Sequence, residues 1–341
     1  MKIKAVVDKV PGGMMIFPLL IGAIIRTIWP GLPDDTVFKS SFTGGLLTGS
    51  TSLLAAFYIC LGSTIEFRAA GYVLKKGVSL WLSKIVTAAI IGFLIKFLAP
   101  DQNHMFLGLS ALAIVAAFSD SNGGLYMALM GQLGKRQEDV AAYSIMSLES
   151  GPFFTMLILG VAGLAAFPLR AFIFALLPLI IGMVLGNLDK NMREFLSKGK
   201  DVLIPLFAIG LGFGINLKDV FQAGFAGIIL GFGVVVVTGV VLYLVDRLVG
   251  GTGLAGVAAA STAGNAAAVP MAVAAVYTGY QSVAGQATVQ VAAAVIVTSI
   301  CVPIITAFFA KRSGVTRGEQ SVQQEAEQQS HVDVSAKEAH N

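Results

Sequence analysis

Along this chain, long apolar stretches alternate with short breaks that carry polar or charged residues. Most of the stretches are close to the roughly 20 residues that an α-helix needs to cross a bilayer. Such a chain is typical of a polytopic membrane protein, whose backbone polar groups are satisfied within helices. The pattern predicts an all-α fold with ten transmembrane helices. They are expected at residues 13–28, 43–61, 78–98, 105–130, 140–166, 171–187, 202–215, 221–245, 254–277 and 283–309.

Composition supports this class and gives the orientation. Of 341 residues, 56% are hydrophobic and 12% are charged, against about 25% charged residues in soluble domains. The net charge of +4 is dispersed among short loops, which argues against a nucleic-acid-binding face. With the N-terminus inside, 18 of the 23 Lys and Arg residues fall on the cytoplasmic side. This positive-inside bias predicts cytoplasmic termini, and the polar segment 313–341 is expected to be a disordered cytoplasmic tail.

Short sequence matches recur in the same order in two halves of the chain, which indicates an internal duplication. Each half contains five predicted helices, and an odd number makes the second copy enter the membrane in the opposite orientation. We therefore predict two inverted five-helix repeats, residues 1–168 and 169–312. The matches are 18–22 with 178–182 at four of five positions, 57–67 with 207–217 at five positions, and 119–123 with 262–266 more weakly.

The fourth and ninth predicted helices are interrupted near their centres. The fourth contains Ser-Asp-Ser-Asn-Gly-Gly at 119–124, and the ninth contains Gly264 and Pro270. Glycine weakens a helix, and proline removes a backbone donor. Irregular backbone at membrane depth is tolerated where it is buried in protein or lines a cavity. Because the repeat relates the two interruptions, we expect the two broken helices to cross near the midplane and to bind a ligand there.

Two acidic residues fall inside predicted helices. A charge at mid-bilayer is costly, so Asp120 in the fourth helix is expected to be functional. The alternative is that Asp120 caps a half-helix that begins near Asn122. Glu149 in the fifth helix is interpreted in the same way, with a neutral, hydrogen-bonded glutamic acid as the alternative. We expect Asp120 and Glu149 to take up and release a coupling proton.

The other candidates are polar residues near the predicted crossing. Asn122 and Asn265 offer donors and acceptors for hydroxyl groups or an ion, although asparagine at a helix break often satisfies only local backbone. Lys84 is interpreted as snorkelling to the cytoplasmic surface, with a pair to an intramembrane acid as the alternative. The predicted substrate-binding residues are Ser119, Asp120, Ser121, Asn122, Gly123, Thr262, Gly264 and Asn265, and further ion or substrate ligands are Ser144, Ser147 and Gln290.

The motifs of enzymes and nucleotide-binding proteins are missing from the sequence. HExxH, GxSxG and GxxxxGK[ST] do not occur, and the GxGxxG at 251–256 follows a membrane span rather than a strand. The two cysteines lie in apolar stretches, and no metal-ligand spacing is present. We therefore expect no cofactor and no metal, and a carrier rather than a channel or an intramembrane enzyme.

Three motifs resemble the 2-keto-3-deoxygluconate permease family of bacterial inner membranes. They are Val-Pro-Gly-Gly-Met-Met at 10–15, Phe-Ser-Asp-Ser-Asn-Gly-Gly-Leu-Tyr at 118–126 and Glu-Ser-Gly-Pro-Phe at 149–153. The resemblance covers about residues 1–312 and implies import of 2-keto-3-deoxygluconate, a sugar acid, together with protons. It also implies kinship with the fold of bile acid:sodium symporters, in which a panel domain accompanies a core domain with crossing broken helices 4 and 9. Sodium coupling stays open, because polar groups of this region bind sodium in those relatives.

The expected mechanism is alternating access, in which the core domain moves against the panel domain. A proton on Asp120 or Glu149 would remove its repulsion of an anionic sugar acid, so proton and substrate would bind cooperatively. The expected partners are the sugar acid, the coupling ion and the lipid bilayer. A sodium-coupled carrier of another organic anion is the alternative, and the sequence predicts no oligomeric state.

Overall fold

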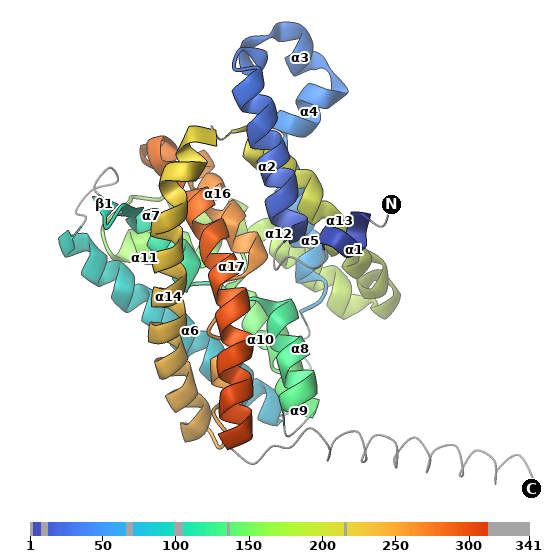
Figure 1. The fold of residues 1–341 in the computed structure, drawn as a ribbon. Helices are drawn as coiled ribbons and strands as arrows, with labels where there is room; N and C mark the ends of the chain where they lie inside the picture. The colour runs from blue at the N-terminus through green and yellow to red at the C-terminus, as the bar shows by residue number, and fades with distance from the viewer. Residues whose placement is uncertain are drawn as a thin grey trace, which may run out of the picture.

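The computed structural model describes residues 3–7, 13–65, 71–98, 105–134, 137–214 and 217–312, so the predicted tail at 313–341 lies outside it. The described chain is almost entirely helical (Figure 1). The elements are α1 Ile3–Val7, α2 Gly13–Ile28, η1 Leu32–Asp34, α3 Thr36–Ser40, α4 Phe42–Thr48, α5 Ser50–Gly62, α6 Gly71–Leu98, β1 Met105–Phe106, β2 Leu109–Ser110, α7 Ala111–Phe118, α8 Gly123–Leu133, α9 Gln137–Ala141, α10 Tyr143–Met146, η2 Ser147–Glu149, α11 Pro152–Val161, α12 Leu169–Leu188, α13 Lys190–Phe213, α14 Leu217–Leu248, α15 Leu254–Ala258, η3 Gly264–Ala268, α16 Val269–Val276, η4 Thr278–Tyr280 and α17 Gln281–Arg312.

Several helices are long and apolar enough to cross a membrane. Among the described residues, α6, α12, α14 and α17 each contain a sufficient apolar stretch. Two bent pairs raise the number to six if each pair is one span: α4 with α5, bent by 67°, and Asp139–Glu149 with α11, bent by 58°. The chain is therefore a helical membrane protein. The ten transmembrane helices stay a prediction, because several of the predicted apolar stretches are divided into shorter helices.

The predicted boundaries agree best where a helix is apolar to its ends. The stretch 13–28 coincides with α2. In contrast, α13 begins at Lys190, twelve residues before the apolar stretch 202–215. Its first half carries charged residues on an exposed surface, which a search for apolar stretches does not include. Helix α6 likewise begins at Gly71, seven residues before the predicted start.

Helices α2, α5, α12 and α13 pack together on one side of the molecule, and we call them the panel group (Figure 1). Two close approaches between backbones hold this group. An added Cβ at Gly22 would overlap the backbone of Ile209 and Phe213, and one at Gly182 would overlap that of Ile59 and Ser63. Glycine lets helix backbones approach closely. Both contacts join a helix of one half of the chain to a helix of the other half.

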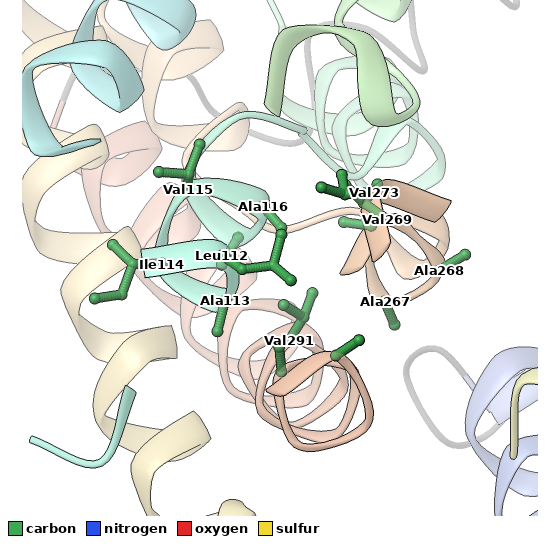
Figure 2. Close-up of a cluster of buried hydrophobic side chains, with 14 of the residues drawn as sticks. Leu112, Ala113, Ile114, Val115, Ala116, Ala267, Ala268, Val269, Val273 and Val291 are labelled. Atoms are coloured by element: carbon green, nitrogen blue, oxygen red, sulfur yellow. The ribbon is translucent and has the colours of Figure 1, made fainter. Parts of the chain in front are cut away.

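The helices from α6 to α11 and from α14 to α17 form a second body, the core group, around the short helix α7. All eight residues of α7 are buried. A helix that is apolar on every side has to pack against other elements on every side. Figure 2 shows side chains of α7, among them Leu112 and Ala116, near Val291 of α17 and near Val269 and Val273 of α16. Long helices α6, α14 and α17 surround α7 (Figure 1). The end of α7 is therefore fixed deep inside the protein.

Candidate functional site

The fourth predicted helix is broken, as expected, at residues 119–122. Helix α7 ends at Phe118, and α8 begins at Gly123. Asn122 is the N-cap of α8, and its Oδ1 accepts a hydrogen bond from the Leu125 N–H at 3.1 Å. The alternative in which Asp120 caps this half-helix is therefore wrong, because Asn122 occupies that position.

The ninth predicted helix is also broken, but at a different place from the one expected. Helix α15 ends at Ala258, and the next helical turn, η3, begins at Gly264. Pro270 lies in the first turn of α16. Backbone N–H groups in the first turn make no hydrogen bond within the helix, so the missing N–H of proline is tolerated there. Pro270 therefore starts a helix rather than interrupting one, and the non-helical residues 259–263 make the break.

The two breaks cross and are hydrogen-bonded to each other. We call residues 119–122 and 259–263 the crossing point. The Ala263 N–H donates to the carbonyl of Asp120 at 3.2 Å, which joins the backbones of the two broken segments. The freed backbone groups are thus largely satisfied across the crossing. Three further bonds are Ser121 Oγ to the Ala259 carbonyl at 3.0 Å, the Asn122 N–H to Ser261 Oγ at 3.0 Å, and Thr262 Oγ1 to the Ala117 carbonyl at 3.0 Å.

Both predicted acids lie at this crossing, and each is only 1% exposed. Asp120 accepts hydrogen bonds at both oxygens, from Ser150 Oγ at 3.4 Å and from Asn265 Nδ2 at 3.3 Å. Glu149 Oε1 accepts the Ser121 N–H at 2.7 Å. Glu149 Oε2 is buried and has no hydrogen-bond partner among the residues that the structure describes. The two carboxyl groups therefore have unlike surroundings.

Glu149 reaches the crossing because of a third break, which the sequence analysis did not predict. The turn η2 ends at Glu149, and Gly151 has a φ of +104°, a conformation that favours glycine. Pro152 then starts α11. The Gly-Pro pair was the available signal, since this dipeptide commonly marks a turn. This third break brings Ser150 next to Asp120 and Glu149 next to Ser121, both in the break of the fourth helix.

Lys84 is a functional candidate that the sequence analysis placed wrongly. Its side chain is fully buried, and Nζ donates to the carbonyl of Ser261 at 2.9 Å and contacts that of Ala259 at 3.5 Å. It interacts electrostatically with Asp120 and Glu149. Because α6 begins at Gly71, Lys84 lies about 20 Å along the helix, too deep for the side chain to snorkel to its start. The alternative of an association with intramembrane acids is the better description.

A polar cavity of about 580 Å³ lies between the crossing point and the panel group. It separates α8 and α10 of the core group from α5 and α13 of the panel group. Three residues that were not predicted also line it: Thr64 from the turn after α5, Tyr143 from α10 and Asp201 from α13. They are far apart in the sequence, so only the folded structure shows that they share a cavity. The predicted residues that line it are Asn122, Gly123, Ser144, Ser147, Gly264 and Asn265.

The other predicted residues lie behind the cavity or away from it. Ser119, Asp120, Ser121 and Thr262 are buried in the crossing itself. Gln290 donates to the carbonyl of Gly108 at 2.6 Å, at the far end of α7. It is also eight residues, or about 12 Å, from the α17 residue that contacts the crossing, Thr298. The structure therefore does not bring Gln290 to the crossing point. Among the described residues, no group of three His, Cys, Asp or Glu side chains has a metal-binding arrangement.

Broken helices that cross inside a bundle of membrane helices, beside a polar cavity, define a membrane transport protein. The family model for 2-keto-3-deoxygluconate permease matches residues 4–315 of this chain. Two similar proteins named 2-keto-3-deoxygluconate permease are those of Enterobacter sp. (strain 638), 48% identical over 318 residues, and Bacillus subtilis (strain 168), 46% identical over 316 residues. The matches cover 92% of this chain and 95% and 94% of those proteins. The chain belongs to the 2-keto-3-deoxygluconate permease family, a family of transporters rather than enzymes.

Proposed function

We propose that this protein imports 2-keto-3-deoxygluconate together with a proton across the bacterial inner membrane by alternating access. The names of the relatives support the substrate. The observation that carries the coupling is the pair of buried carboxyl groups, Asp120 and Glu149, directly behind the polar cavity. A buried charge at this depth is costly. A carboxyl group there is therefore expected to take up a proton when an anion enters.

The polar cavity is the proposed substrate site. Its volume is adequate for a six-carbon sugar acid. The first turn of α8 begins at the cavity with Gly123 and Gly124, and the positive end of a helix favours a carboxylate. Asp201, Asn265 and Ser147 surround the same space and suit the hydroxyl groups. Ser119, Ser121 and Thr262 then act by holding the crossing rather than by touching the substrate.

The coupling proton is proposed to bind at the carboxyl pair, with Glu149 as its main site. Asp120 accepts hydrogen bonds at both oxygens, from Ser150 and Asn265, and such bonds favour the ionised carboxylate. Glu149 Oε2 lacks a partner among the described residues, and a proton on that oxygen lowers the cost of burying it. The carrier then binds and transports the anionic sugar acid when Glu149 is protonated.

Alternating access is supported by a second cavity at the opposite end of the core group. This cavity, of about 410 Å³, is lined by Tyr58, Pro152 and the end of α16, whereas the polar cavity is lined by α8 and α10 (Figure 1). Phe57 and Ser150 line the polar cavity, and their near neighbours Tyr58 and Pro152 line the second one. The two cavities therefore approach each other at α5 and at the turn before α11.

Contacts between the halves support the proposed inverted repeats, residues 1–168 and 169–312, and the distribution of Lys and Arg supports the proposed cytoplasmic termini. The Gly22 and Gly182 contacts of the panel group join equivalent residues with the roles of the halves exchanged. In the core group, Ser119 Oγ lies 3.0 Å from Thr155 Oγ1, and the Thr262 N–H donates to Thr298 Oγ1 at 3.1 Å. Both members of the second pair lie 143 residues after those of the first. A two-fold relation between the halves produces this kind of repetition.

Uptake of labelled 2-keto-3-deoxygluconate into proteoliposomes tests the proposal directly. With the membrane potential clamped at zero, an acidic exterior should drive accumulation of about tenfold per pH unit for one proton per substrate. An inward sodium gradient at equal pH should have no effect. Accumulation that follows sodium and ignores the pH gradient would replace the proton with sodium.

The substrate site is tested with alanine at Asn122 and at Asn265. Both side chains line the polar cavity, and a lost hydrogen bond to a charged or strongly polar ligand costs about 1.5 to 3 kcal/mol. We expect each variant to raise the half-saturating substrate concentration about tenfold or more. Asn191→Ala, at an exposed position of α13, is the matched control. Unchanged affinity in both cavity variants would exclude this site.

A further inference from the structure

Lys84 joins the first half of the chain to the broken helix of the second half. Its ammonium group donates to the Ser261 carbonyl at 2.9 Å and is held there without exposure to solvent. Burying an ammonium group is expensive unless opposite charge is near. Asp120 and Glu149 lie close to it: the Ala259 carbonyl that Lys84 Nζ contacts also accepts from Ser121 Oγ, and the Ser121 N–H donates to Glu149. The crossing point thus encloses two acids and one base.

The other charged groups packed around α6 lie apart from Lys84, Asp120 and Glu149. Helix α6 packs against α7, α9, α10, η2, α11 and α14. Neither α7 nor α11 contains a titratable residue, and α10 contributes Tyr143, whose hydroxyl faces the Ser121 carbonyl. Lys76 of α6 lies eight residues from Lys84 and pairs with Asp139 of α9 at 2.5 Å and with Asp246 of α14 at 3.0 Å. These three residues pair with one another and also carry one net negative charge, about 12 Å from Lys84 along α6.

We propose that Lys84 is the positioning residue that limits coupling to a single proton. Two carboxylates and one ammonium carry one net negative charge, so one proton makes the buried site neutral. The ammonium also keeps the second carboxylate ionised, since a nearby opposite charge favours the charged form. Without it, both carboxyl groups hold protons more tightly. This inference rests on the proposed proton coupling and names the group that sets its stoichiometry.

The test compares net uptake with substrate counterflow in Lys84→Gln. Counterflow requires the protonated carrier, whereas net uptake also requires the proton to leave on the inner side. We expect the pH at which counterflow falls to half to rise by about one unit or more. Net uptake at pH 7.5 inside should fall at least tenfold, while counterflow at pH 6 is retained. A merely structural defect would lower both activities and leave the pH profile in place.

Two charge-matched variants serve as controls. Lys84→Arg retains the positive charge and should keep the wild-type midpoint, and Lys75→Gln, at an exposed position of the same helix, should change neither activity. An unshifted midpoint in Lys84→Gln, or a shifted one in Lys84→Arg, would overturn the inference. If the wild type itself ignores the pH gradient, the proposed proton coupling has failed instead.

A double variant covers the case in which Lys84→Gln does not fold. Lys84→Gln with Glu149→Gln restores one net negative charge and should be recovered from membranes in folded form, as judged by substrate binding. If the double variant is equally unfolded, the hydrogen bonds to the carbonyls of Ser261 and Ala259, rather than the charge, are what Lys84 provides. That result would overturn the inference.

Discussion

Replacing Glu149 with glutamine is expected to abolish accumulation of the sugar acid against its gradient and to leave exchange largely intact. Glutamine resembles the protonated acid, and its side-chain oxygen can still accept the Ser121 N–H that Glu149 Oε1 accepts at 2.7 Å. It cannot release a proton. The carrier would therefore behave as though always loaded with its proton, and a pH gradient could no longer be converted into a substrate gradient.

The measurement is steady-state uptake into proteoliposomes with the exterior one pH unit more acidic and the membrane potential clamped at zero. Wild-type protein should reach an accumulation of about tenfold, and Glu149→Gln should equilibrate at a ratio of one. Glu194→Gln, at an exposed position of α13, removes an acid without touching the crossing and should accumulate normally. Normal accumulation in Glu149→Gln would show that the proton is carried elsewhere, and Asp120→Asn would then be the next variant.

The breaks in the fourth and ninth helices were predictable because their cause is local. Polar residues and glycines inside an apolar stretch disfavour a continuous helix, and irregular backbone is tolerated there only in the protein interior or beside a cavity. The break at 119–122 therefore follows from the sequence alone. The exact position of the second break does not. Pro270 was expected to interrupt the ninth helix but starts α16, because a proline is equally compatible with the first turn of a helix.

The features that sequence reasoning missed depend on residues far apart in the chain. Lys84 donates to a carbonyl 177 residues away, and the depth of its side chain follows from where α6 begins. The polar cavity is lined by Thr64 from the turn after α5, by Tyr143 from α10 and by Asp201 from α13. No local pattern distinguishes these residues from surface ones. Gln290 was expected to bind an ion or substrate near the crossing, but its side chain donates to the carbonyl of Gly108.

Alanine at Gly123 is expected to impair transport at least tenfold, whereas alanine at the next residue, Gly124, should be tolerated. Both glycines lie in the first turn of α8 and line the polar cavity. An added Cβ at Gly123 would overlap the ring of Tyr143, while one at Gly124 would lie 3.7 Å from its nearest neighbour, the Oδ1 atom of Asn122. Alanine also favours a helix over glycine by up to about 1 kcal/mol, so Gly124→Ala has no evident reason to destabilise α8.

The consequence at Gly123 follows from the position of Tyr143. Its hydroxyl lies 3.5 Å from the Ser121 carbonyl at the crossing, and its ring lines the polar cavity. A ring displaced by the new methyl group would move into the cavity and take space from the substrate, or it would pull α10 away from α8. Initial uptake rates, together with the substrate-dependent rise in melting temperature, separate these outcomes: a filled cavity lowers both, and a displaced helix also lowers the melting temperature without substrate. Equal transport by Gly123→Ala and Gly124→Ala would show that the approach of Tyr143 to α8 is not needed for the site.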